Sequence, residues 1–192
     1  MFEVLDEVCQ PKKATKYSAC VDLFAREDVT IGAGETKIVP LGVKIDLKLL
    51  AKQVQKNNEL ITWVLDFENK RGEFFNTFLK SHKLDIHIRS SLSAKKRLII
   101  ANGTGQIDLD YPDEIGIILH NPIQNFSATL TSNHLDYISI DTEVDIDTYV
   151  GNTAYIQKGD KVAQITLIEH KSYLMGYESE EERIGGYGST GE

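Results

Sequence analysis

Short stretches in which apolar and polar residues alternate recur along this chain. Residues 43–47 and 84–88 alternate in this way, and so does the acidic segment 107–111. A period of two is typical of strands that have one buried and one solvated face. If residues 107–111 are extended, Asp108 and Asp110 point to one face of the strand and the apolar residues to the other. A solvated edge strand explains the same pattern.

Other segments also read as strands. Residues 28–31 and 36–39 flank a glycine-containing turn, and residues 115–119 and 162–168 are nearly continuous apolar runs, which is typical of strands buried on both faces. Short strands separated by glycine turns favour an all-β barrel or sandwich over alternating strands and helices.

One region departs from this pattern. Between residues 47 and 83 the apolar residues recur at helical spacings among Lys, Glu, Gln and Asn. Gly72, preceded by Lys70 and Arg71, interrupts the second part. The segment therefore predicts a helix, a turn and a second helix.

Composition narrows the function classes. The 192 residues fit one domain, and the net charge of −8 argues against an extended nucleic-acid-binding surface but not against a small polyanionic ligand. Cys9 and Cys20 lack metal-ligand spacing and are expected to be reduced, buried thiols of a cytosolic protein. No apolar run is long enough for a membrane span and no signal peptide is visible, so we expect a cytoplasmic protein that does not bind membranes.

Five segments in a fixed order give the chain its strongest signal. They are residues 18–23, 89–92, 102–111, 159–165 and 183–191. Together they resemble the ordered motifs of the trimeric dUTPases (dUTP diphosphatases). The resemblance implies a jelly-roll-like β domain, a homotrimer with active sites between subunits, and Mg²⁺-dependent hydrolysis of dUTP to dUMP and pyrophosphate. That reaction keeps uracil out of DNA and supplies dUMP for thymidylate synthesis.

The same resemblance assigns roles to individual residues. Asp108 matches the general base that activates the attacking water, and Asp22 matches the aspartate that holds Mg²⁺ through a metal-bound water. Asn102 and Tyr111 match the residues that recognise uracil and stack on deoxyribose. The expected substrate-binding residues are, in full, Arg89, Ser90, Ser91, Asn102, Gly105, Ile107, Tyr111, Gln164, Arg183, Tyr187, Gly188, Ser189 and Thr190.

Simpler structural roles compete with some of these assignments. Without the resemblance, Asp22 reads as a turn aspartate. Asn102 is also a turn former, and both of its roles can hold together. Gln164 reads nearly as well as a polar residue paired to backbone within a buried strand. For Arg89 an internal salt bridge and a phosphate contact are about equally favoured.

Compared with the family, the chain is expected to carry two insertions. A single β domain covers residues 1–182, with a helical insertion at about 48–83 and a second insertion at about 122–157. Residues 183–192 form a glycine-rich arm, expected to be mobile until it closes over the nucleotide.

Two other functions stay open. A dCTP deaminase of the same fold needs a glutamate three residues before an asparagine, where this chain has Ile118 before Asn121. A regulatory, protein-binding role is the second, because Trp63 and the phenylalanines of the helical insertion offer an apolar surface for a protein partner. Of the two roles, we expect these aromatics to cover the insertion's own small core.

Overall fold

The computed structural model describes residues 1–58, 71–123, 153–177, 179 and 185. Its strands are β1 (Phe2–Val4), β2 (Val21–Phe24), β3 (Val29–Ile31), β4 (Thr36–Pro40), β5 (Val43–Ile45), β6 (His82–Ile88), β7 (Ile99–Ile100), β8 (Gly105–Asp108), β9 (Gly116–His120), β10 (Ala154–Ile156) and β11 (Lys161–Glu169). The helices are α1 (Leu47–Asn58), α2 (Arg71–Ser81) and α3 (Ser90–Lys96), with short 3-10 helices at Glu7–Cys9 and Ser172–Met175.

All strand pairs are antiparallel. A four-stranded sheet has the order β2-β11-β6-β8, a three-stranded sheet has the order β4-β9-β7, and β1 pairs with β5 and β3 with β10. One hydrophobic core joins them: Ile86 of β6, Ile117 of β9, Val43 of β5 and Ile156 of β10 are each at most 2% exposed. The sheets therefore pack face to face, as an all-β domain requires.

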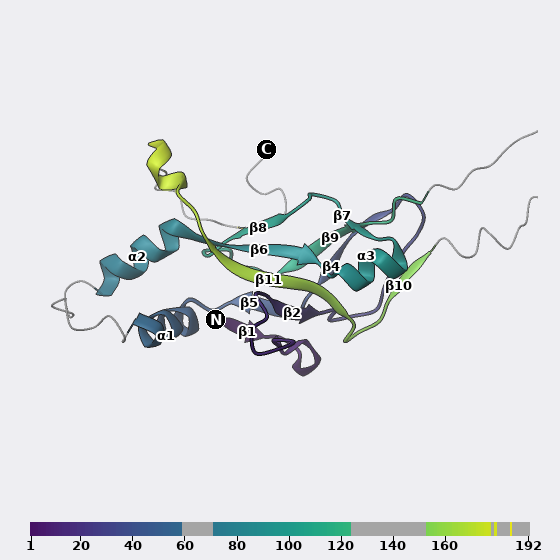
Figure 1. Ribbon diagram of the computed structural model, residues 1–192, viewed down its shortest axis with the longest axis horizontal. Coiled ribbons are helices and arrows are strands. Elements are labelled where there is room, and N and C mark those ends of the chain that lie inside the picture. The colour runs from purple at the N-terminus through teal and green to yellow at the C-terminus, as the bar shows by residue number, and fades with distance from the viewer. Residues whose placement is uncertain (59–70, 124–152, 178, 180–184, 186–192) are drawn as a thin grey trace, which may run out of the picture.

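Two helices confirm the prediction for residues 47–83, and in Figure 1 they extend from one end of the strands. The Asp46 carboxylate starts α1 by accepting hydrogen bonds from the amides of Lys48 (2.8 Å) and Leu49 (2.9 Å). The predicted turn at Gly72 is wrong, because this residue lies within α2.

Several apolar residues of these helices contact the main core, whereas Leu47 and Leu49 of α1 are exposed. Leu50 of α1 is fully buried, and Phe75 and Phe78 of α2 are half-buried against the core. Their burial favours the core-covering role over an apolar docking surface. Trp63 lies outside the described residues.

Two strand predictions need correction. The strand predicted over residues 107–111 ends at Asp108, and Leu109 and Asp110 form a turn in which the Tyr111 amide donates to the Asp108 carbonyl (3.1 Å). The run 115–119 forms β9 from residue 116, but Ile117 and Leu119 are buried while Gly116 and Ile118 are only half-buried. It is therefore a strand with two unequal faces.

Cys9 and Cys20 are free cysteines, but only Cys9 is buried, and Cys20 is half-exposed. Among the helices that the structure describes, none is long and apolar enough to cross a membrane.

Candidate active site

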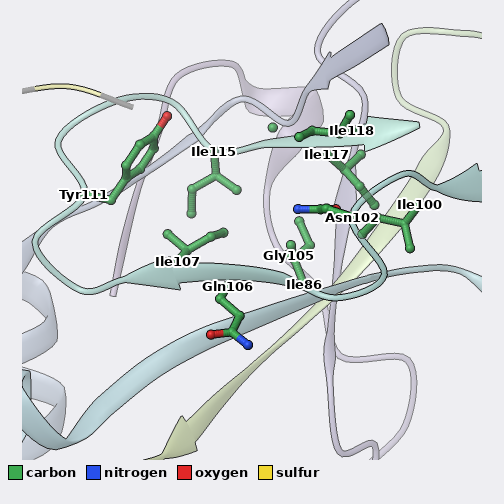
Figure 2. A pocket seen from close by; sticks show the side chains of 11 residues that line it. Ile86, Ile100, Asn102, Gly105, Gln106, Ile107, Tyr111, Ile115, Ile117 and Ile118 are labelled. Carbon is green, nitrogen blue, oxygen red and sulfur yellow. The ribbon is translucent and has the colours of Figure 1, made fainter. Parts of the chain in front are cut away.

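A pocket of about 230 Å³ opens where the turn between β7 and β8 meets β9. Asn102 and Tyr111 lie towards opposite ends of it, with Ile107 and Ile115 between them (Figure 2). Gln106 lies on the other side of β8, as the period of two requires. Four residues that the sequence assigned to the nucleotide, Asn102, Gly105, Ile107 and Tyr111, thus line one cavity.

Two glycines shape this turn. Gly103 has a φ of 73°, in the left-handed region that favours glycine. Gly105 is the first residue of β8 and pairs with Ile86 of β6. A Cβ atom on Gly105 would lie 2.4 Å from Cγ2 of Ile86, so only glycine fits there without displacing this buried side chain.

Asp108 and Tyr111 lie on either side of the turn that ends β8. The Tyr111 side chain is only 7% exposed, and its hydroxyl donates to the carbonyl of Glu114 (3.4 Å). Asp108 is exposed to solvent. The ring is therefore fixed as a wall of the pocket, while the carboxylate next to it is accessible to water.

A second group of polar side chains surrounds Asp22, whose carboxylate is only 1% exposed. It accepts a hydrogen bond from Gln164 Nε2 (3.2 Å) and forms ion pairs with Lys161 Nζ (3.2 Å) and Arg89 Nε (3.4 Å). Burial raises the pKa of the Asp22 carboxyl, but the hydrogen bonds from Gln164 and Lys161 and the charge of Arg89 outweigh this effect, and the pKa lies below its ordinary value. We call Asp22, Arg89, Lys161 and Gln164 the Asp22 cluster.

An irregularity in β11 brings two of these donors together. Lys161 and Gln164 are three positions apart and would face opposite sides of a regular strand. The pairing with β2 shifts register between Lys161 and Ala163, as in a β-bulge, and both side chains then reach Asp22. Sequence reasoning missed Lys161 because nothing in the sequence shows this bulge.

The residues after β6 begin a short helix. Ser90 and Ser91 are exposed in the first turn of α3, and the Arg89 carbonyl accepts from the Leu92 amide (2.9 Å). Arg89 itself forms the internal salt bridge that the sequence left open, while its side chain remains 25% exposed. For Gln164 the partner is a side chain rather than the backbone.

The pocket and the Asp22 cluster do not converge within one chain. Asp22 lies on β2 and Asp108 on β8, at opposite edges of the four-stranded sheet. In the register of the sheet, Asp22 lies opposite Gln164 of β11. Asp108 lies opposite Lys83 of β6, and Lys83 lies opposite Ile168 of β11. Three strand spacings across the sheet and four residues along it place the two aspartates roughly 20 Å apart.

The remaining expected site residues, Arg183, Tyr187, Gly188, Ser189 and Thr190, lie outside the described residues. Within the part of the chain that the structure describes, no group of three or more His, Cys, Asp or Glu side chains could hold a metal ion.

Comparisons with known proteins identify the family and the fold of this chain. No protein-family model matches the chain. The deoxyuridine 5'-triphosphate nucleotidohydrolase of Rickettsia bellii (strain OSU 85-389) is 30% identical over 188 residues, which is 94% of this chain and 86% of that protein. The fold is similar to the dUTPase of Streptococcus mutans (TM-score 0.53, 20% identity, 88% of this chain and 95% of that one).

A mutant dUTPase of phage phi11 of S. aureus, described with a structural Mg(II) ion, has a TM-score of 0.54 at 18% identity, and the match covers 98% of each chain. These structures confirm the expected jelly-roll β fold. With nearly a third of its residues shared over almost its whole length, and with that fold, the chain belongs to the deoxyuridine 5'-triphosphate nucleotidohydrolase (dUTPase) family.

Proposed function

We propose that this protein hydrolyses dUTP to dUMP and pyrophosphate. The observation that supports the proposal is the pocket between β8 and β9, which is lined by the amide side chain of Asn102 and the fixed ring of Tyr111, groups that suit a base and a sugar. Family membership supports the same reaction.

The pocket suits a deoxyuridine. The Asn102 amide offers one donor group and one acceptor, which match the edge of uracil, and Gly105 and Ile107 line the same cavity. The ring of Tyr111 would pack against C2′ of the sugar, where a ribose hydroxyl would clash. Selection of dUTP over UTP follows from that contact.

Asp108 is the proposed general base. Its exposed carboxylate at the end of β8 accepts a proton from the water that attacks the α-phosphorus, and pyrophosphate leaves in line. Arg89, Ser90, Ser91 and Gln164 would bind the phosphates, together with Arg183 and the glycine-rich arm that carries Tyr187, Gly188, Ser189 and Thr190.

Assembly into a homotrimer is part of the proposal. Asp22 and Asp108 lie roughly 20 Å apart within one chain, which is too far for the Asp22 cluster and the proposed general base to act on the phosphates of one nucleotide. A neighbouring subunit that brings its Asp22 cluster to this pocket would complete the site.

Mg²⁺ is the proposed cofactor, since a phage relative is described with Mg(II) and this ion commonly binds through phosphate oxygens and water. The residues around Asp22 do not fit a divalent cation. The carboxylate is buried, and two positive side chains and an amide already occupy it. No step is therefore assigned to a metal held by Asp22.

The deaminase alternative is not favoured. Ile118 stands where that reaction needs a glutamate, and it lines the pocket with an apolar side chain.

Pyrophosphate release from dUTP, dCTP, dTTP and UTP in the presence of Mg²⁺ tests the proposal. Wild type should turn over dUTP selectively, and Asp108→Asn should lower kcat by about 10²- to 10⁴-fold, the usual contribution of a general base. Asp110→Asn, an exposed carboxylate two residues further on, is the matched control and should stay close to wild type. A folded protein that turned over none of the four nucleotides would refute the proposal.

A further inference from the structure

The Asp22 cluster has the charge of an anion-binding site. One buried carboxylate faces two cationic side chains, so the cluster carries a net positive charge with a neutral amide beside it. A metal cation brought to this carboxylate would be repelled by Arg89 and Lys161, whose nitrogens lie 3.4 and 3.2 Å from it. An anion would be attracted.

Each donor keeps hydrogens beyond the one that it directs at Asp22. The guanidinium of Arg89 contacts Asp22 through Nε and carries further N–H groups. The ammonium of Lys161 has three N–H groups in all, and the amide of Gln164 has two. The side chains of Arg89 and Lys161 are 25% and 42% exposed, whereas Asp22 is 1% exposed. The buried carboxylate thus holds Arg89 and Lys161 in place through one N–H group each, while their other N–H groups remain accessible to a ligand from solvent.

Lys161 is held from a second direction as well. Its ammonium lies 6.0 Å from the centre of the Phe24 ring, and the bulge in β11 turns it towards Asp22. A long lysine side chain fixed at two points loses less freedom when it binds a ligand.

We propose that Asp22 is a positioning residue that orients Arg89, Lys161 and Gln164 towards the phosphates of the nucleotide, that Lys161 is one of the phosphate-binding residues, and that this arrangement works without a metal ion on Asp22. The inference rests on the proposed function for the identity of the ligand. It differs from the metal-binding role that family resemblance implies for Asp22.

The test is binding of α,β-imido-dUTP, a non-hydrolysable analogue, by calorimetry in EDTA and again in Mg²⁺. Wild type should bind the analogue in EDTA, and Asp22→Asn should weaken that binding by about tenfold or more, as expected when a charge-assisted contact to the donors is lost. Deoxyuridine, which has no phosphate, should bind wild type and Asp22→Asn equally.

Variants of Lys161 test the same inference in the same binding assay. Lys161→Met should weaken analogue binding in EDTA by about tenfold, and Lys161→Arg should restore most of it. Lys12→Met is the matched control, because the Lys12 ammonium lies over the same Phe24 ring (5.7 Å) while its backbone, not its side chain, pairs with Asp22. It should bind like wild type.

Three results would overturn the inference. The first is that wild type binds the analogue only in Mg²⁺. The second is that Asp22→Asn loses affinity only when Mg²⁺ is present. The third is that Lys161→Met binds the analogue in EDTA as tightly as wild type does. Failure of the proposed function looks different, because wild type would then bind no analogue even with Mg²⁺.

Discussion

Replacing Gly105 by alanine tests the close contact between β8 and β6. The new Cβ would lie 2.4 Å from Cγ2 of Ile86, whereas carbon atoms in contact are about 3.5–4.0 Å apart. The two residues are paired strand partners, and Ile86 is 2% exposed, so neither can withdraw freely. Overpacking of this kind costs about 1–3 kcal/mol.

Urea denaturation at a fixed protomer concentration measures this loss, and a double-mutant cycle identifies its cause. Ile86→Ala alone should cost about 2–5 kcal/mol. In the double variant the space left by Ile86 accommodates the new methyl group. The double variant should therefore lose clearly less stability than the sum of the losses of the two single variants.

Gly103→Ala is the control for backbone strain. Its φ is 73°, but a Cβ there meets nothing within 4 Å, so it should lose about 1–2 kcal/mol and add independently to Ile86→Ala. If Gly105→Ala were as stable as wild type, or were additive with Ile86→Ala, the contact argument would be refuted.

Two further predictions concern the ion pairs of Glu114 and Asp6. Glu114→Ala should destabilise the protein by about 1–3 kcal/mol in urea denaturation, because the carboxylate accepts from the Gly42 amide (2.7 Å) and pairs with Arg26 (2.9 Å). Glu114→Gln keeps an acceptor for that amide, so equal losses in both variants would contradict this reasoning. The pKa of Asp6 lies below its ordinary value through its hydrogen bond with Lys158, so its ionised form stabilises the fold above about pH 4 and this contribution disappears as pH falls through the lowered pKa. Asp6→Asn should therefore have a lower urea midpoint than wild type at pH 7 and an equal one near pH 2; a gap independent of pH would count against the ion pair.

Local patterns predicted the elements whose determinants lie within a few residues. Alternation at residues 84–88 and helical spacing at residues 47–58 gave the strand and the helix that form there. The prediction for residues 107–111 went wrong in an informative way. Leu109 and Tyr111 are buried and Asp110 is exposed, so the alternation continues through a turn, and a period of two alone cannot separate the two cases.

Contacts between distant segments were the harder part. Asp22 and Lys161 are 139 residues apart in sequence, and their contact depends on a register shift within β11. The sequence could not decide between an internal salt bridge and a phosphate contact for Arg89, because its partner, Asp22, lies on a distant strand. Resemblance to a family identified most of these positions, but only the fold shows which side chains meet.

The separation of the pocket from the Asp22 cluster within one chain also bears on how such an enzyme changes over time. Substitutions in the turn between β7 and β8 alter the cavity without touching β2 or the start of β11. Base preference and phosphate handling can therefore drift separately under selection. A library confined to residues 100–107 and 115–118, which leaves Asp108 unchanged, is accordingly the place to seek variants that accept a different pyrimidine and keep the same hydrolytic chemistry.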